Sequence, residues 1–111
     1  MGTFNFMFKE IIYKRTYNYS SGELFIHEYY VVKKLTQLIH NPNGPASTMY
    51  YCNGSIKFQS YCNYNKLHRT DGPARIWFNK DGSVFKKDYW VNGFKIEVNS
   101  DENFIASLIL Y

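Results

Sequence analysis

Two histidines, His40 and His68, lie 28 positions apart, and each opens a motif that ends in Gly-Pro-Ala. Imidazole is a common metal ligand and general base, so this matched pair invites a catalytic or metal-binding interpretation. However, a metal site needs clustered ligands at recognisable spacings, and neither Cys52 nor Cys62 forms such a spacing with His40. A structural task explains both histidines at once, because a ring beside a tight turn can hydrogen-bond backbone groups left open there. We therefore expect a structural role, no metal and no cofactor.

Other catalytic patterns are missing from the sequence. It contains no Gly-x-Ser-x-Gly nucleophile elbow and no phosphate-binding glycine-rich loop. The acidic residues that occur outside the repeated motif show no pairing that would place two of them in one pocket: Glu10, Glu23, Glu97, Asp101 and Glu102. We therefore expect that the protein is not an enzyme.

The histidine motif belongs to an internal repeat. The stretch from Lys66 to Ala74 matches a degraded copy that ends at Ala46, and the 28-residue shift continues without a gap to Tyr61 and Tyr89. A fixed period of this size is typical of a repeat array. A worn first copy aligns Gly22 with Gly54 at a shift of 32, with the extra length after Leu35. We interpret the chain as one domain, 1–111, with a degenerate repeat over 14–37, a second over 38–65, a third over 66–97 and a cap over 98–111.

Each repeat carries a turn signal at its centre: Ser21-Gly22, Asn53-Gly54 and Asp81-Gly82. Asn-Gly and Asp-Gly favour the two-residue type I′ hairpin turn, in which both central residues have positive φ. With these turns the expected cross-strand partners are Arg15 with Glu28, Ala46 with Tyr61, Ala74 with Tyr89, Arg75 with Asp88, and Phe78 with Phe85. A second turn is expected at Tyr64-Asn65, at Asn92-Gly93 and, with poorer turn residues, at Val32-Lys33.

The Gly-Pro-Ala motif is expected to link the repeats. Pro45 and Pro73 lack an N–H and therefore belong at the start of a strand. Gly44 and Gly72 are expected to supply backbone freedom before them.

The fold class that follows is mainly all-β, with repeated antiparallel hairpins in a single twisted, ribbon-like sheet. Alternation predicts a better core face that carries Met49, Ile56, Phe58, Cys62, Trp77, Val84 and Trp90, together with Tyr17, Leu24, Ile26 and Tyr30. The opposite face is aromatic but mixed with polar residues. Residues Phe4, Phe6 and Phe8 alternate like a capping strand. The tail from 99 to 111 predicts a short helix that begins near Ser100 or Asp101, with a last strand as the alternative.

Composition limits the kinds of partner and the location that the protein could have. Among 111 residues, 20% are aromatic, the net charge is +4 and the basic residues are scattered, which does not favour a nucleic-acid or membrane patch. The sequence has no stretch long enough to span a bilayer. Only two cysteines are present, which argues against a disulfide scaffold and favours reduced thiols. We expect a cytoplasmic location.

At His68-Arg69-Thr70-Asp71-Gly72-Pro73-Ala74 and the following Asp81-Gly82-Ser83, the sequence resembles a family of repeats from large DNA viruses and phages, written Leu-His-Arg-x-Asp-Gly-Pro-Ala. These repeats are similar to MORN repeats, which are also β-hairpin units laid side by side. The resemblance covers about 38–97. It implies a scaffold or adaptor fold and a viral origin, with the host cytoplasm or the virion as location.

Three functions follow as expectations. The first is a protein-binding or assembly module with a host or viral partner, in which Tyr50, Tyr61, Arg69, Arg75, Phe78 and Tyr89 are the candidate contacts. Arg75 falls on the opposite face from the others, and the rings equally well pack the second side of a thin sheet. The second is a counter-defence inhibitor that binds a host enzyme. The third is single-stranded nucleic-acid binding. An exposed sheet edge also allows a homodimer.

Overall fold

The computed structural model describes residues 10–98 and 100–109. It is mostly β, with 49% of residues in strands and one helix. The elements are β1 (Tyr13–Asn18), β2 (Leu24–Lys33), β3 (Thr36–Ile39), β4 (Ser47–Tyr50), β5 (Ile56–Ser60), β6 (Cys62–Asn63), β7 (Lys66–Leu67), β8 (Arg75–Phe78), β9 (Val84–Val91), β10 (Phe94–Ile96) and α1 (Asp101–Ile109).

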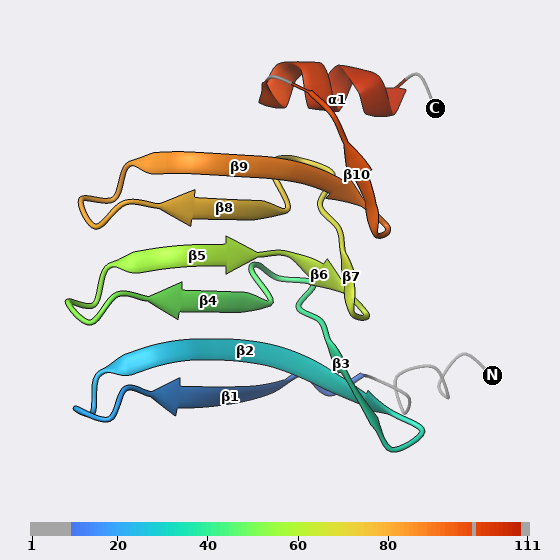
Figure 1. The fold of residues 1–111 in the computed structure, drawn as a ribbon. Coiled ribbons are helices and arrows are strands. Elements are labelled where there is room, and N and C mark those ends of the chain that lie inside the picture. The colour runs from blue at the N-terminus through green and yellow to red at the C-terminus, as the bar shows by residue number, and fades with distance from the viewer. Residues whose placement is uncertain (1–9, 99, 110–111) are drawn as a thin grey trace.

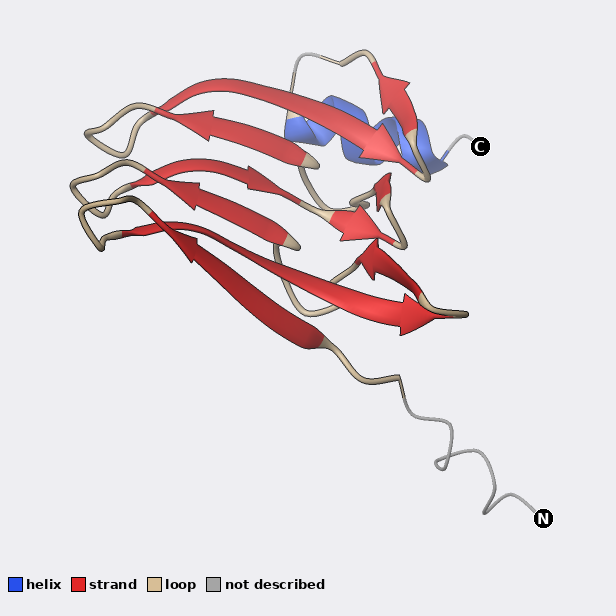
Figure 2. Cartoon of the chain, turned by 60° about the horizontal axis from the view of Figure 1, so that its bottom comes forward, coloured by secondary structure: helices blue, strands red, loops and turns tan. Residues whose placement is uncertain are grey.

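Eight strands form one antiparallel sheet in the order β1-β2-β4-β5-β8-β9-β10, to which β3 adds by pairing with β2, and β6 and β7 form a separate two-stranded sheet. Three long hairpins, β1–β2, β4–β5 and β8–β9, therefore lie side by side. The shorter strands β3, β6, β7 and β10 lie together at one end of these hairpins (Figure 1). Figure 2 shows that the loops of the long hairpins line up at one end of the array. The predicted fold, mainly all-β with antiparallel hairpins and a short C-terminal helix, is confirmed. The prediction of a single sheet did not include the small second sheet of β6 and β7.

The short hairpins are closed by two-residue turns in which both residues have positive φ. These are Tyr64-Asn65, with φ of 47° and 69°, and Asn92-Gly93, with φ of 49° and 84°. Both turns lie where the sequence predicts them, and the φ values are those of a type I′ turn. In the first repeat the turn is Lys34-Leu35, with φ of 49° and 66°, so the expected position at Val32-Lys33 is wrong. The β2–β3 hairpin has four residue pairs where β6–β7 has two, so the extra length is shared by both strands.

The long hairpins use a different turn from the one predicted. Only the glycines have positive φ there, and Tyr51 O accepts the Gly54 N–H at 2.9 Å while Tyr51 N–H donates to Ser55 O at 2.8 Å. This is a three-residue loop with a glycine bulge rather than a type I′ turn. The Asn53 side-chain oxygen accepts the Ser55 N–H at 3.0 Å and thereby closes the loop over its own backbone.

The three-residue loop shifts the register by one position relative to the predicted two-residue turn, and a second bulge in the strands restores the predicted register a few residues from the loop. Arg15 pairs with Glu28 and Arg75 with Asp88, as predicted. Phe78, however, pairs with Val84 and not with Phe85, because the bulge lies between Trp77 and Phe78. The prediction therefore holds along the strands and is wrong at the last pair.

The expected distribution of buried residues is wrong. None of the eleven apolar residues assigned to the better core face is among the buried residues of the described chain. The buried residues include Ala46, Thr48, Ala74 and Tyr89, which lie on the opposite face. Ala46 and Ala74 are small enough for tyrosine rings to lie over them, whereas no described helix or strand forms a second layer above the large side chains of the other face.

The helix closes the β9 end of the array (Figure 1). Ser100 Oγ accepts the Asn103 N–H at 3.1 Å, so Ser100 is the N-cap of the two candidates, Ser100 and Asp101, that the sequence offers. Phe104 is fully buried, and its ring centroid lies 4.8 Å from that of Tyr89. The expected capping strand at Phe4, Phe6 and Phe8 lies outside the described residues. In the described part of the chain no helix has the length and apolar character needed to cross a membrane.

Candidate functional site

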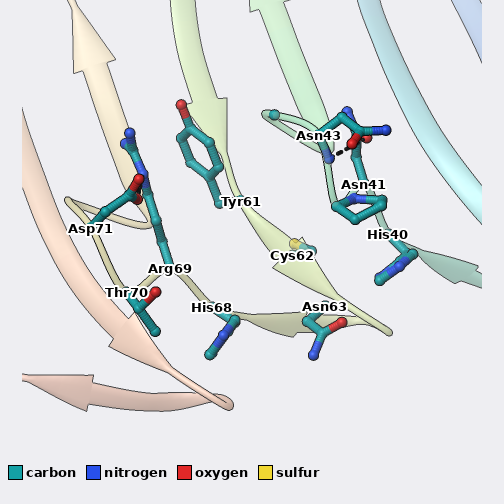
Figure 3. A pocket seen from close by; sticks show the side chains of 12 residues that line it. His40, Asn41, Asn43, Tyr61, Cys62, Asn63, His68, Arg69, Thr70 and Asp71 are labelled. Carbon is teal, nitrogen blue, oxygen red and sulfur yellow. Dashed lines mark hydrogen bonds and ion pairs between the residues drawn. The ribbon is translucent and has the colours of Figure 1, made fainter. Parts of the chain in front are cut away.

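A polar groove of about 640 Å³ lies between the two Gly-Pro-Ala linkers. Its floor carries Tyr61, which joins β5 to β6, and Cys62 at the start of β6 (Figure 3). One wall is the linker that carries Arg69, and the other carries Asn41 and Asn43. The groove thus exists because two linkers of the same design stand one repeat apart.

Arg69 is held within its own wall of the groove. Its guanidinium carbon lies 4.0 Å from the centroid of the Tyr61 ring, Nε donates to Asp71 at 2.9 Å and Nη1 donates to Pro73 O at 3.1 Å. A Cβ on Gly72 would lie 3.1 Å from this guanidinium. Gly72 does not have positive φ, so space for Arg69, rather than backbone freedom, explains the glycine.

The second repeat keeps the linker bond without the charge. Asn41 Nδ2 donates to Pro45 O at 3.0 Å, which is the bond that Arg69 makes to Pro73 one repeat later. Gly44 also lacks positive φ, and a Cβ there would meet only Asn41 at 3.9 Å. The two prolines precede β4 and β8 by two residues, so they lie just before the strands rather than inside them.

The two histidines bind backbone groups at the short hairpins. His40 Nδ1 accepts the N–H of Tyr64 at 3.2 Å, and His68 Nδ1 accepts the N–H of Asn92 at 3.0 Å. These donors are the first residues of the two type I′ turns, 28 positions apart. An Nδ1 that accepts a hydrogen bond places the imidazole proton on Nε2. Both side chains point away from Tyr61 in the groove (Figure 3).

A charged cluster forms around Tyr64 in the second repeat. Its hydroxyl donates to Glu10 at 2.8 Å, its ring stacks on His40, and Lys33 Nζ lies 4.0 Å from the ring centroid. The hydrogen bond from Tyr64 lowers the pKa of the Glu10 carboxyl below its ordinary value. The cluster ties the start of the described chain to the second repeat.

The remaining candidate contacts do not gather into one surface. Tyr50 is half-buried, with its hydroxyl 3.3 Å from His27 Nδ1. Tyr89 is 3% exposed and its hydroxyl donates to Asp101, so its ring lies beneath α1. Arg75 lies on the opposite face, as the register predicts, and donates to Asp88 at 2.9 and 2.6 Å. Phe78 is half-buried beside Val84.

A continuous apolar row crosses the sheet on the Arg75 face. Ile26 pairs with Met49, Met49 with Phe58, and Phe58 with Trp77, across β2, β4, β5 and β8. All four side chains are half-buried, and Tyr17, which extends the row onto β1, is 50% exposed. Sequence alternation places these residues on one face but treats that face as core. The signal that could have corrected this is the single-layer fold itself, because none of the described elements covers the row.

Lysines gather at the third-repeat end of this apolar row. Lys86 Nζ lies 4.8 Å from the Trp77 ring, and Lys57 and Lys80 each lie 5.7 Å from the Tyr51 ring. The Tyr51 hydroxyl donates to Phe78 O at 2.7 Å, next to Trp77 in β8. The ion pairs of the described residues do not include these three lysines. The row therefore ends in positive charge.

Within residues 10–98 and 100–109, no three His, Cys, Asp or Glu side chains come together in a way that could hold a metal ion. Cys52 and Cys62 are free thiols. Burial raises the pKa of the Cys62 thiol, which makes it a poor nucleophile. Comparison with protein-family models, with curated proteins and with solved structures finds no match.

Proposed function

We propose that the protein is a non-enzymatic protein-binding or assembly module, built from MORN-like repeats of viral or phage origin, and that the apolar row is its contact surface. The observation that carries the proposal is the row Ile26, Met49, Phe58 and Trp77, which lies on a sheet face over which the described residues form no second layer. A domain normally buries such a face against another element. Contiguous apolar surface of this kind is typical of interaction sites.

The partner that fits this surface is a protein segment with apolar side chains and carboxylates. Its apolar side chains would cover the row, and its carboxylates would meet Lys86, Lys57 and Lys80 at the third-repeat end. Those lysines already lie over aromatic rings, so an acidic partner adds charge attraction without displacing an existing ion pair. Trp77 is the expected anchor, because tryptophan contributes strongly to interface energies.

The test compares two charge substitutions in one strand. Phe58→Asp puts a carboxylate in the apolar row, and Gln59→Asp puts the same charge on the opposite face of β5. The experiment is affinity capture from a nuclease-treated host lysate. We expect the wild type and Gln59→Asp to recover a stoichiometric protein partner, and Phe58→Asp not to recover it. A synthetic peptide from an acidic, apolar segment of that partner should bind the purified protein, and more weakly as salt rises.

Equal loss in both variants, or no loss in either, would contradict the proposed surface. Capture that disappears with nuclease, together with salt-sensitive binding of oligothymidylate, would favour the single-stranded nucleic-acid alternative. If the partner is a host defence enzyme and its activity falls on binding, the counter-defence alternative is favoured instead.

A further inference from the structure

The two ends of the hairpin array differ. At the C-terminal end, β9 is followed by β10 and α1, and the Tyr89 hydroxyl donates to Asp101 at the start of the helix. At the other end, β1 pairs with β2 on one side, and no described strand pairs with its outer side. An uncovered edge presents unpaired backbone groups that another strand can bind.

The hydrogen bonds identify which residues of β1 point outward. Tyr19 N–H donates to Glu23 O across the hairpin, so Tyr19 points its backbone groups toward β2. Because this direction alternates along a strand, Tyr17 and Arg15 also point inward. Lys14, Thr16 and Asn18 therefore direct their N–H and C=O groups to the open side.

We infer that two copies of the chain pair through β1, antiparallel, about a twofold axis at Thr16. Outward residues must meet outward residues for the ladder to form, and this centre places Thr16 opposite the partner's Thr16 and Lys14 opposite the partner's Asn18. On the other face Arg15 meets the partner's Tyr17. Threonine pairs are favourable across strands, and no like charges oppose one another.

The other symmetric registers bring like charges together or pair fewer residues of β1. A centre at Arg15 would set the two Arg15 side chains opposite each other, and a centre at Tyr17 would pair only residues 16–18 of β1. A centre at Lys14 would place the two Lys14 ammonium groups opposite each other and would leave fewer residues of β1 paired. The other charge on the strand is already occupied, because Arg15 Nε lies 2.6 Å from Glu28 Oε1 and its Nη1 donates to Gln37. Self-pairing about a twofold axis closes on itself, because both copies contribute the same edge. This inference goes beyond the proposed function and does not depend on it, because the apolar row can bind a partner in a monomer or a dimer.

The test is analytical ultracentrifugation of the full chain, wild type and Thr16→Pro. Proline removes the outward N–H of residue 16, and an edge strand tolerates this loss because the inward bonds to β2 remain. We expect a wild-type dimer, twice 13.2 kDa, and a dissociation constant at least ~10-fold higher in Thr16→Pro. Thr16→Val is the matched control, since it keeps the N–H and the β-branched shape, and it should remain dimeric.

A second pair of variants tests the register without proline. Asn18→Lys brings a lysine opposite the partner's Lys14 and should weaken the dimer, while adding Lys14→Asp should restore it. A wild type that is monomeric at every concentration would overturn the inference. So would a Thr16→Pro variant that dimerises like the wild type, or a full-length monomer that dimerises only after residues 1–9 are removed. Asn18→Lys with unchanged affinity would reject this register.

Discussion

The imidazole ring of His40 lies flat against the phenol ring of Tyr64, with 4.0 Å between the ring centroids and 9° between the ring planes. The same histidine accepts the backbone N–H of Tyr64, so ring and backbone of one turn residue are held together. His68 makes the equivalent backbone bond to Asn92, but the asparagine side chain has no ring on which the histidine could stack. The second repeat is therefore where the linker and the short hairpin are most tightly joined.

Glu10 gives this arrangement a pH dependence. The Tyr64 hydrogen bond depresses the folded-state pKa of Glu10, so its contribution is fully present above the ordinary value of 4.5 and is lost as pH falls through the lower folded value. We expect the urea midpoint of the wild type to exceed that of Glu10→Gln at neutral pH. The two midpoints should converge in acid, as measured by circular dichroism. A difference that stays constant with pH would contradict the charged role of Glu10.

Three glycines should respond differently to alanine. Gly82 has φ of 91°, so Gly82→Ala should cost about 1–2 kcal/mol. Gly72→Ala should displace the Arg69 guanidinium from Tyr61, because its Cβ would lie 3.1 Å from that group. Gly44→Ala has ordinary space and should be near neutral, within about 0.5 kcal/mol. Thermal unfolding of the three variants measures this order, and equal losses at Gly82 and Gly44 would argue against the bulged loop.

The Arg75–Asp88 pair should couple more strongly than Arg15–Glu28. The Asp88 side chain is 7% exposed and that of Glu28 17%, so the first pair is less screened by water. We expect double-mutant cycles with alanine to give a larger coupling free energy for Arg75–Asp88, with Arg15–Glu28 near the ~0.2–1 kcal/mol of exposed pairs. A reversed order would show that exposure does not decide the coupling here.

The Asp88 carboxylate should also make folding stability depend on pH in the acid range. Burial acts to raise its pKa, but hydrogen bonds from Arg75 and Trp90 outweigh burial and lower the pKa below the ordinary value of 3.8. Its contribution is therefore present above that value and is lost as pH falls through the lower folded pKa. Asp88→Asn should be less stable than the wild type at neutral pH, and the gap should narrow in strong acid.

Tyr89 predicts an alkaline transition at the helix. Burial, followed by the hydrogen bond to Asp101, raises the pKa of Tyr89 to about 12. Because the folded state favours the neutral phenol, stability is full below the ordinary pKa of 10.0 and falls as pH rises toward that raised value. We expect helical circular dichroism to decrease in this window in the wild type. Tyr89→Phe, which keeps the ring on Phe104, should show a smaller decrease, and an identical decrease would assign the transition to another group.

Much of this fold can be predicted from the spacing of repeated residues in the sequence. The 28-residue repeat predicts the antiparallel array, and the Arg15–Glu28 and Arg75–Asp88 pairs fix its register. The bulge beside Phe78 was missed because Asn-Gly and Asp-Gly suit two loop types, and side-chain bonds such as Asn53 to Ser55 decide between them. Burial was harder to predict. Alternation finds the two faces of a sheet, but it does not show that the described part of the chain builds no second layer over Met49 and Phe58.

The linker hydrogen bonds recur with the same sequence period, which has a consequence for length. Arg69 N–H donates to Trp90 O as Asn41 N–H donates to Cys62 O, and Ala74 N–H donates to Asp88 O as Ala46 N–H donates to Ser60 O. A tandem duplication of 38–65 would meet a matching surface on both sides and lengthen the sheet by about 10 Å, the width of two strands. Gene duplication or deletion of one repeat would therefore change the length of the sheet in steps of one repeat, without redesigning any contact.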